Sequence, residues 1–408
     1  MGTAKVWCHG TQRALSPAAT LAHVRPLMAA MGITRVAVVT GLDRLGVPVV
    51  TVCRPNGRSL SVAQGKGLTV DAAKASGLME SIEGWHAEHV RLPVVDAAWR
   101  DLAGAPALDP LALPIPLGSR WQPGRAVPWV EGRDLAGGGP VFVPLELVTL
   151  DCRVPLPPGF GCFQISTNGL ASGNAPAEAV LHALCELIER DAVTLWRQRD
   201  PFRKAASRLD PATVDEPDAA FLIERLTAAG MALAVWDATS DLAVPAFLCH
   251  IMEADLAAHD GQGWATGAGC HPEPGIALVR AITEAAQARL THIVGTRDDI
   301  GRRCYVHLEP ERIRGHHAVL TRQPGRRDFR TLPGTAAATF EADLELLLQR
   351  LAAAGLARCV AVDLSRPEFG IPVVKMIVPG LEDGIEVPGW QPGPRARAAM
   401  SFDPAPAP

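Results

Sequence analysis

The chain has 408 residues and a formal net charge of −4, so its length allows two domains or one large domain. Hydrophobic residues make up 48% of it, which is enough for a sizeable core and argues against global disorder. The small net charge excludes a strongly basic surface for nucleic acid or for an anionic membrane. Since the chain has no apolar run of about 18 residues and no apolar signal segment after Met1, we expect a cytoplasmic protein.

The cysteines give no sign of a cross-linked or zinc-bound scaffold. There are nine of them, an odd number, and no pair has Cys-x-x-Cys spacing. This argues against a disulfide framework and against a zinc ribbon. Most of the cysteines are expected to be small buried hydrophobic residues.

The first part of the chain predicts one helix and the strands of a small sheet. Arg13 and Ser16 precede the helix and are available for ligand contact, although their spacing alone favours a capping or surface role. Asn56-Gly57 is a tight-turn signal. The predicted elements are a helix near Pro17–Met31 and strands at Arg35–Thr40, Val47–Cys53 and Ser59–Val62.

The segment Gln64-Gly65-Lys66-Gly67-Leu68-Thr69 follows these strands and only superficially resembles a phosphate-binding loop. The P-loop motif requires Gly-x-x-x-x-Gly-Lys-Ser/Thr, and Gly67 stands where that motif needs its metal-binding hydroxyl. We interpret the segment instead as a nest of backbone N–H groups before a helix, where it can contact an anion.

The next predicted helix runs from about Val70 to Val90 and is amphipathic. At about 100° per residue, Ser76, Glu80 and Glu83 fall on one face. The opposite face is apolar and suits a core; it carries Ala75, Leu78, Ile82 and Trp85.

Residues 104–139 are rich in proline and glycine and predict a linker or a loop that runs over the surface. Strand character resumes at Val141–Leu150. A short strand ending at Ile165–Thr167 then leads into the central helix of the chain.

The central helix runs from Asn174 to Trp196, with Asn174 as the expected N-cap and Pro176 in the first turn. One face is apolar and predicts core packing: Val180, Leu181, Leu184, Leu187, Ile188 and Leu195. The opposite face gathers polar side chains within roughly 80° of one another. They are Glu178, His182, Glu186 and Glu189.

A third helix of this kind, about Gly275 to Ile293, places Arg280, Glu284 and Gln287 together on its polar face. The region that follows, 295–334, is rich in arginine and irregular, and predicts a solvated loop or a contact for phosphates or an acidic peptide. The remaining predicted elements are helices at 217–230 and 338–355 and strands at Ala232–Asp237, Pro245–Ile251, Cys359–Leu364 and Pro372–Val378.

A single acidic helix face is usually a solvated surface, but here the pattern recurs on three helices. A Gly-rich segment precedes each, at 64–67, 167–174 and 267–269, so three loop-then-helix units predict one shared site. Clustered carboxylates repel unless a cation neutralises them, and all-oxygen ligands favour Mg²⁺ or Ca²⁺ over zinc or copper. With Lys66, Arg190 and Arg280 available for phosphate charge, the hypothesis is a nucleoside triphosphate held through metal ions.

The three polar faces resemble the motifs of the YcaO family, and the resemblance covers roughly residues 10–380. They are Ser76-x-x-x-Glu80-x-x-Glu83, Glu186-x-x-Glu189-Arg190 and Glu284-x-x-Gln287. Supporting stretches lie at 41–48, 65–67, 167–174, Arg297-Asp298-Asp299 and 371–375. The sequence is most similar to the subgroup associated with TfuA-like partner proteins.

The resemblance implies an α+β, YcaO-type fold with mixed or antiparallel sheets covered by helices and a nucleotide site between three acidic helices. It implies an enzyme that uses ATP and Mg²⁺ to phosphorylate a backbone amide oxygen of a peptide or protein substrate. Attack by a Cys, Ser or Thr side chain then gives an azoline, whereas attack by external sulfide gives a thioamide. The subgroup favours the thioamide, a TfuA-like partner protein and a homodimer.

The resemblance also implies roles for individual residues. Those implied to bind Mg²⁺ or order its waters are Glu80, Glu83, Glu186, Glu189 and Glu284. Those implied to contact the nucleotide are Ser16, Lys66, Ser76, Asn174, Arg190, Arg280 and Gln287. Glu189, Arg190 and the terminal Pro408 are implied to be catalytic.

Two features bear on this assignment. In the family the first motif often ends Glu-Arg, but here Gly84 follows Glu83, which removes one phosphate ligand and shifts its task to Lys66. In azoline-forming members a Pro-x-Pro-x-Pro terminus reaches the active site, and Pro404, Pro406 and Pro408 match it. The match keeps cyclodehydration open, although the composition of the tail alone favours a disordered terminus.

We therefore expect a catalytic domain at 1–388, with the Pro/Gly-rich loop at 104–139, and a Pro-rich tail at 389–408. Two other function classes stay open. A non-catalytic scaffold would bind nucleotide or peptide, but it would not need clustered like charges. A Mg²⁺-dependent phosphohydrolase or an ATP-grasp-like ligase would turn over without peptide or would phosphorylate a free carboxylate.

Overall fold

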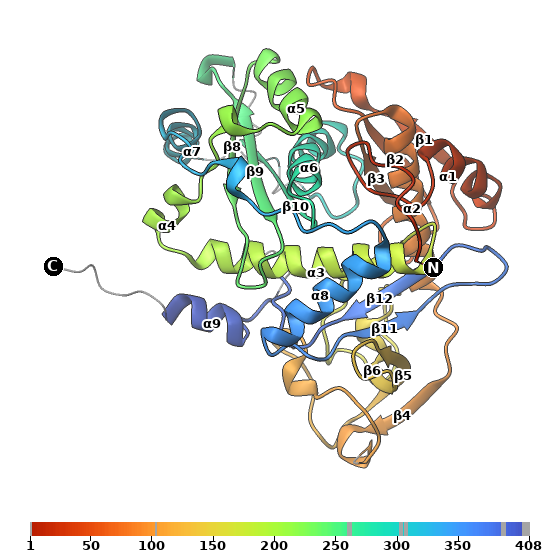
Figure 1. Ribbon diagram of the computed structural model, residues 1–408. Coiled ribbons are helices and arrows are strands. Elements are labelled where there is room, and N and C mark those ends of the chain that lie inside the picture. Colours follow the sequence, from red (N-terminus) through yellow and green to blue (C-terminus); the bar gives the residue numbers. More distant parts are fainter. Residues whose placement is uncertain are drawn as a thin grey trace.

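The computed structural model describes residues 2–102, 104–258, 263–301, 305, 309–384 and 389–401. Within these residues the strands form three sheets, and the named strands pair antiparallel throughout. Helices pack around the sheets and between them (Figure 1). This is the α+β class with helix-covered antiparallel sheets that the sequence predicts.

The first sheet has the strand order β1-β2-β3, and Val50 in its middle strand pairs with Val38 on one side and Gly65 on the other. The helix predicted at 17–31 ends at Val24, because Pro26 lacks the N–H donor that a continuing helix needs. The elements are α1 (Pro17–Val24), β1 (Arg35–Val38), β2 (Val49–Cys53), β3 (Val62–Lys66) and α2 (Val70–Glu88).

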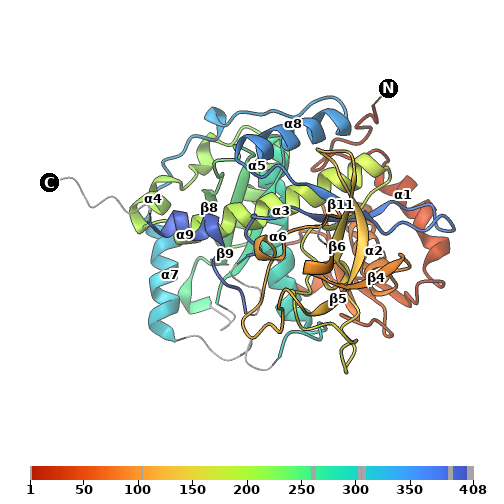
Figure 2. The same ribbon diagram turned by 90° about the horizontal axis from the view of Figure 1, so that it is seen from below.

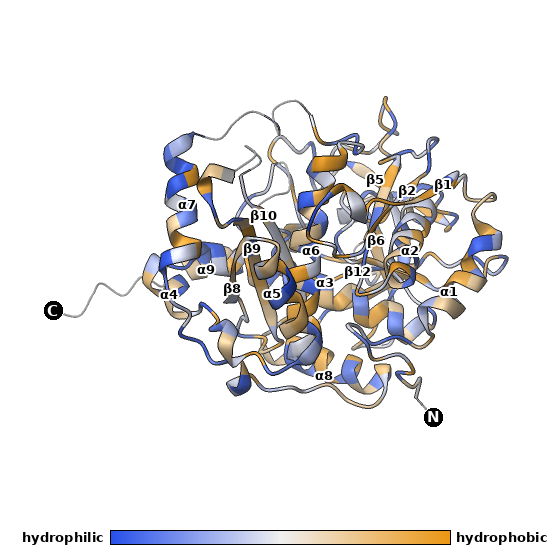
Figure 3. Ribbon diagram, turned by 90° about the horizontal axis from the view of Figure 1, so that it is seen from above, coloured by the Kyte–Doolittle hydropathy of each residue, from blue (hydrophilic) through white to orange (hydrophobic). Residues whose placement is uncertain are grey.

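The second sheet has the strand order β10-β9-β8 and lies beside helices α5 to α7. Helix α7 corrects the prediction that 295–334 is irregular. Figure 3 shows why its pattern is weak, since α7 is mostly hydrophilic and Leu320 is its buried residue. The elements are α4 (Pro201–Ala206), α5 (Pro217–Ala228), β8 (Met231–Asp237), β9 (Ala246–Glu253), β10 (Ala265–Cys270), α6 (Pro274–Val294) and α7 (Pro310–Arg322).

The third sheet has the order β4-β5-β11-β12-β7, and β6 also pairs with β5. Strand β5 lies inside 104–139, so the prediction of a linker or surface loop there is wrong. Its Val127, Trp129 and Val130 are buried, and the Trp129 indole N–H donates to the Ala97 carbonyl at 3.0 Å. The strands are β4 (Val94–Ala98), β5 (Ala126–Asp134), β6 (Pro140–Pro144), β7 (Leu170–Ser172), β11 (Val360–Asp363) and β12 (Val373–Ile377).

Helix α3 (Pro176–Gln198) lies at the centre of the molecule, between the second and third sheets (Figures 1 and 2). It packs on β7 and β12 on one side and on β9 and β10 on the other. Its N-cap is Ala175 and not the predicted Asn174, whose side chain accepts a hydrogen bond from the Thr20 hydroxyl at 2.9 Å. The helices α8 (Phe340–Ala353) and α9 (Pro394–Ser401) also contact α3.

Short 3-10 helices connect several of these elements. They lie at Arg25–Leu27, Thr40–Leu42, Trp99–Leu102, Pro110–Ala112, Leu145–Leu147, Pro211–Thr213, Leu256–Ala258 and Phe329–Thr331. Residues 165–167, predicted to end a strand, precede β7 without belonging to it. In the described part of the chain, no helix combines the length and the apolar character that crossing a membrane requires.

The region predicted as a Pro-rich tail begins with an ordered helix, α9, that is tied to α3. The Arg395 guanidinium donates from Nε and Nη2 to the two oxygens of Asp191, each at 2.9 Å. The Asp191 side chain is fully buried. Residues 389–401 therefore belong to the folded body, whereas Pro404, Pro406 and Pro408 lie outside the described residues.

We predict that Arg395→Ala lowers the free energy of unfolding by roughly 3–5 kcal/mol, because it leaves the buried Asp191 carboxylate without its partner. The measurement is urea denaturation followed by circular dichroism. Met400→Ala, an exposed position on the same helix, is the matched control and should change stability by less than about 0.5 kcal/mol. Equal unfolding midpoints for the two variants would contradict the structural role of this ion pair.

Candidate functional site

The three polar helices belong to three similar strand–helix units. In each unit three residues connect a strand to a helix: β3 to α2, β7 to α3, and β10 to α6. Each of these strands stands at one end of the strand order of its sheet. The prediction of three units is therefore right, but each of the expected Gly-rich loops contributes to a strand, at 64–66, 170–172 and 267–269.

Glycine occurs in these units because the backbones of strand and helix touch. A Cβ atom on Gly65 would overlap with the Ala73 carbonyl oxygen, and one on Gly267 would overlap with the Ala285 nitrogen. A Cβ on Gly173 would lie 2.6 Å from a backbone nitrogen of α3. Gly65 therefore serves close packing, whereas Lys66, Gly67 and Leu68 line the cavity described below, and the anion contact expected of 64–69 stays a prediction.

The three units surround one cavity of about 740 Å³. Helix α2 lines it from Ala72 to Gly84 and helix α6 from Val279 to His292, which is about 18 Å along α2 and about 20 Å along α6. Helix α3 contributes the polar face that begins at Glu178. The polar faces predicted from helical periodicity thus meet in space.

The N-terminal segment, residues 2–16, forms one wall of this cavity through His9, Gly10, Thr11 and Arg13. The Gly10 N–H donates to Asp218 at 2.8 Å. A Cβ on Gly10 would meet Leu68 and Val279, so this wall closes the cavity where α2 and α6 begin. We call this part of the cavity the N-terminal end.

Six carboxylates line the cavity. Glu178 holds the N-terminal segment, and the other five are Glu80, Glu83, Glu186, Glu189 and Glu284. Burial raises the pKa of Glu80 to about 7, of Glu83 to about 8 and of Glu189 to about 7. It raises the pKa of Glu186 as well. Neighbouring negative charges add to the effect, as Glu284 does on Glu189, so this cavity is poised to bind a cation.

Basic and hydroxyl side chains hold these carboxylates in place. Lys66 Nζ lies 2.6 Å from Glu284 Oε2, and its charge lowers the pKa of Glu284 although burial acts to raise it. One oxygen of Glu83 accepts from the backbone N–H and the hydroxyl of Ser172, at 2.8 and 2.7 Å. Arg190 Nη2 lies 3.7 Å from a Glu186 oxygen.

A histidine and an arginine meet nearer the N-terminal end. Arg280 Nη1 lies 3.2 Å from His182 Nδ1. Burial and the charge of Arg280 both lower the pKa of His182, so this imidazole is neutral at pH 7. The buried Nε of Arg280 has no hydrogen-bond partner within the described residues, and it is therefore suited to an anionic ligand.

The donor set fits a hard cation that shares its shell with a ligand. The buried Oε2 of Glu189 also has no hydrogen-bond partner within the described residues. Among those residues, no three acidic, histidine or cysteine side chains form a complete metal site by themselves. Mg²⁺ matches this arrangement, because it keeps several waters and takes one or two carboxylates together with phosphate oxygens.

Eleven of the predicted site residues line this cavity: Glu80, Glu83, Glu186, Glu189, Glu284, Lys66, Ser76, Asn174, Arg190, Arg280 and Gln287. Ser16 does not belong to the lining, because its hydroxyl caps α1 by accepting from the Ala19 N–H at 3.2 Å. Pro408 lies outside the described residues. The roles that the resemblance implies for these residues stay predictions.

The sequence predictions differ from the structure for two residues that line the cavity. Arg13, for which spacing favoured a surface role, lines the cavity and lies 3.4 Å from Glu178. Glu178 shares the polar face of α3, but it holds the N-terminal segment by accepting from the Ala14 N–H at 2.9 Å. No local signal distinguishes Glu178 from Glu186, since both follow the same helical period.

Comparison with known proteins identifies the family. The family model described as YcaO cyclodehydratase, ATP- and Mg²⁺-binding, matches residues 64–382. The chain belongs to the YcaO family. YcaO proteins form an ATP-dependent enzyme family, and ATP and Mg²⁺ are its cofactors.

Two relatives match nearly the whole chain. An uncharacterized protein of the tfuA 3′ region of Rhizobium leguminosarum bv. trifolii is 41% identical over 394 residues, covering 94% of this chain and 92% of that protein. An uncharacterized protein of Methanothermobacter thermautotrophicus is 35% identical over 379 residues, covering 91% of this chain and 95% of that protein.

Solved YcaO-type structures share the fold. YcaO from Methanopyrus kandleri, bound with AMPPCP and Mg²⁺, has a TM-score of 0.72 and 24% identity, covering 96% of this chain and 98% of that one. A heterocyclase in complex with substrate and cofactor has a TM-score of 0.76 and 24% identity over 94% of this chain. This chain spans 55% of the heterocyclase, about half its length.

We predict that Gly65→Ala lowers the free energy of unfolding by about 1–3 kcal/mol or more, because the new methyl group would push against the backbone of α2. The shift would also displace Glu80 and Glu83, so Mg²⁺-dependent nucleotide binding should fall with stability. Thermal unfolding and calorimetric titration measure the two effects. Gly41→Ala, where the new methyl group meets no atom, is the control; a loss there as large as at Gly65 would contradict the packing argument.

Proposed function

We propose that this YcaO protein activates a backbone amide of a peptide or protein by ATP- and Mg²⁺-dependent O-phosphorylation, and that the product is a thioamide formed with an external sulfur donor. The observation that carries the proposal is the convergence of six carboxylates with Arg190 and Arg280 in one cavity. Within the described residues, Glu189 Oε2 and Arg280 Nε have no partner in the protein, as expected of groups that bind metal and phosphate.

The chemistry that ATP supplies with Mg²⁺ is transfer of its γ-phosphoryl group to the amide oxygen. This converts a poor leaving group into phosphate. A hydrosulfide nucleophile then adds to the amide carbon, and the C–O bond breaks to release phosphate and leave a thioamide. If a cysteine thiol or a serine or threonine hydroxyl of the peptide attacks instead, the product is an azoline.

The chain's own side chains divide the work by charge. Glu80, Glu83, Glu186, Glu189 and Glu284 are proposed to hold Mg²⁺ directly or through water. Lys66, Arg190, Arg280, Gln287, Ser76 and Asn174 are proposed to hold the nucleotide. Glu189 and Arg190 are proposed to be catalytic, because Glu189 Oε2 has no partner within the described residues and the Arg190 guanidinium lies beside the carboxylates.

Gene context supports the thioamide. The Rhizobium relative is encoded in the tfuA 3′ region, which supports a TfuA-like protein as the partner of this chain. The description of the family model as a cyclodehydratase supports the azoline as the alternative product. The catalytic role of Pro408 and the homodimer remain predictions from the family resemblance.

The acidic cavity argues against a scaffold without catalytic activity. Gathering several carboxylates in one cavity costs free energy, and the raised pKa values of Glu80, Glu83 and Glu189 express that cost. A scaffold could bind a nucleotide without such a cluster of carboxylates. A phosphohydrolase would have no need for a second substrate, so dependence of ADP formation on peptide separates the proposed activity from both alternatives.

We predict that the wild type binds the non-hydrolysable analogue AMPPCP only with Mg²⁺, and that Glu186→Gln/Glu189→Gln loses this binding. Each lost charged contact costs about 1.5–3 kcal/mol, which is at least about tenfold in affinity. Isothermal titration calorimetry is the measurement, and Glu345→Gln, on the exposed face of α8, is the control. A well-folded double variant with wild-type affinity would refute the site assignment.

We also predict that Mg²⁺-AMPPCP binding strengthens as the pH rises through about 7 to 8 and releases protons. Glu80, Glu83 and Glu189 carry protons in the empty site below those values, and a bound cation favours their ionised forms. Titration in buffers of different ionisation enthalpy counts the released protons. Glu80→Gln should release fewer protons than the wild type. A wild-type affinity for Mg²⁺-AMPPCP that does not change with pH would contradict the prediction.

A further inference from the structure

The cavity has a second end, opposite the N-terminal end, whose chemistry differs. It lies where α2 and α6 finish and is lined by Arg54, Gly84, Arg297 and the loop Arg58–Ser61, of which Ser59, Leu60 and Ser61 reach the cavity. We call it the loop end. The carboxylates of α2 and α6 lie between the two ends. On α2, Glu80 and Glu83 lie between the lining residues Ala72 and Gly84. On α6, Glu284 lies between Val279 and His292.

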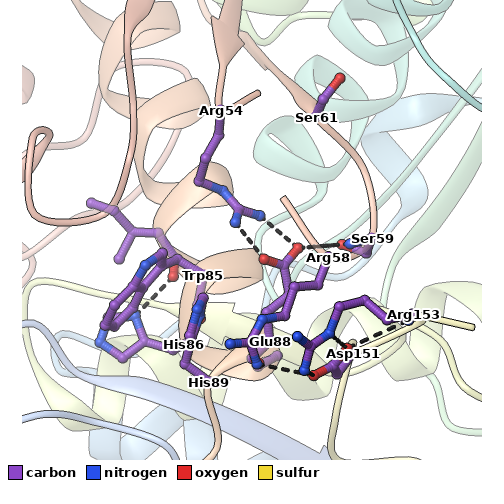
Figure 4. A network of polar contacts seen from close by, with 12 residues as sticks. Arg54, Arg58, Ser59, Ser61, Trp85, His86, Glu88, His89, Asp151 and Arg153 are labelled. Atoms are coloured by element: carbon purple, nitrogen blue, oxygen red, sulfur yellow. Dashed lines mark hydrogen bonds and ion pairs between the residues drawn. The ribbon is translucent and has the colours of Figure 1, made fainter. Parts of the chain in front are cut away.

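Hydrogen bonds hold the loop Arg58–Ser61 at both sides, and Figure 4 shows those of Arg58 and Ser59. The carboxylate of Glu88, at the end of α2, accepts from the Ser59 N–H at 3.0 Å and from the Ser59 hydroxyl at 2.6 Å. Arg58 donates to the Glu88 carbonyl at 2.7 Å and to Asp151 at 2.9 Å. The loop is therefore a rigid edge of the cavity, as a preorganised binding surface requires.

Its other side is joined to the segment that follows α6. The Ser61 N–H and hydroxyl donate to the two carboxylate oxygens of Asp298, at 2.8 and 3.0 Å. Leu60 stands between the two anchored serines and lines the cavity together with Met79 and Leu150. Leu60 thus offers an apolar side chain of a ligand a contact beside the carboxylates.

The charges distinguish what each end can hold. At the loop end, Arg54 donates from both terminal nitrogens to Glu88, and Arg297 donates to Asp299 at 2.9 and 2.6 Å, so both cations are already neutralised. Toward the N-terminal end, Arg280 contacts the neutral His182 and keeps its buried Nε without a partner in the described residues. A phosphate chain is therefore bound better toward the N-terminal end, and an uncharged ligand is bound better at the loop end.

We propose that the nucleotide lies toward the N-terminal end and that the loop end is the subsite for the peptide, with Leu60 contacting the residue beside the reacting amide. The assignment rests on the proposed function, because it needs a phosphoryl donor and a peptide to meet at the carboxylates. The occupant is an extended, uncharged stretch of peptide that carries an apolar side chain. Leu60 is then a residue that determines which peptides are accepted.

Two leucines at opposite ends of the same cavity provide the test. A random linear peptide library displayed on phage is selected on the wild type loaded with Mg²⁺ and AMPPCP, and an enriched peptide is synthesised as the probe. Affinities for this peptide and for Mg²⁺-AMPPCP are then measured by calorimetry for Leu60→Ala and Leu68→Ala. Thermal unfolding shows that each variant is folded, and Leu60→Met, which keeps the apolar volume, should retain peptide binding.

The expected result is a reciprocal pattern. Leu60→Ala should weaken the peptide about tenfold, the effect of losing most of a buried leucine contact, and should leave the affinity for AMPPCP within about twofold. Leu68→Ala should do the reverse. The subsite would be overturned if Leu60→Ala weakened AMPPCP and Leu68→Ala weakened the peptide. It would also be overturned if both variants weakened AMPPCP equally, or if the selection enriched no peptide. A wild type that binds no AMPPCP would instead overturn the proposed function, and the subsite with it.

Discussion

The mutual repulsion of carboxylates gathered in one cavity is the constraint on which this structure depends. Isolated acids are usually scattered over the surface, but here three helices bring six of them to one cavity. Each helix must therefore be held firmly by its opposite, apolar face. The close contact of glycine-containing strands with α2 and α6 supplies that hold, and Lys66 and Arg190 offset part of the repulsion.

Helical periodicity made the acidic site predictable from the sequence. Glu80 and Glu83, or Glu186 and Glu189, repeat at a spacing that places them on one face whatever surrounds the helix. The apolar strands around Val50 and Phe247 were predictable for the same kind of local reason. What joins the three faces into one cavity is tertiary, and only the recurrence of the motif pointed to it.

The errors arose where tertiary contacts override local preference. Gly65 and Gly267 suggest loops, but they lie in strands because a helix backbone passes too close for any side chain. The stretch around Trp129 is rich in proline and glycine, yet it forms a strand paired on both sides. Ser16 and Arg13 cannot be told apart by spacing; one caps a helix and the other reaches the cavity because of how the N-terminal segment folds back.

The contact that each glycine makes in β3 and β10 lies within its own strand–helix unit. The pieces 62–88 and 265–294 therefore carry, in one uninterrupted run, both a share of the acidic lining and the packing that orients it. A substitution at Gly65 or Gly267 is therefore felt first in the share of the lining that its own helix carries, and it reaches the other unit through the Lys66–Glu284 contact.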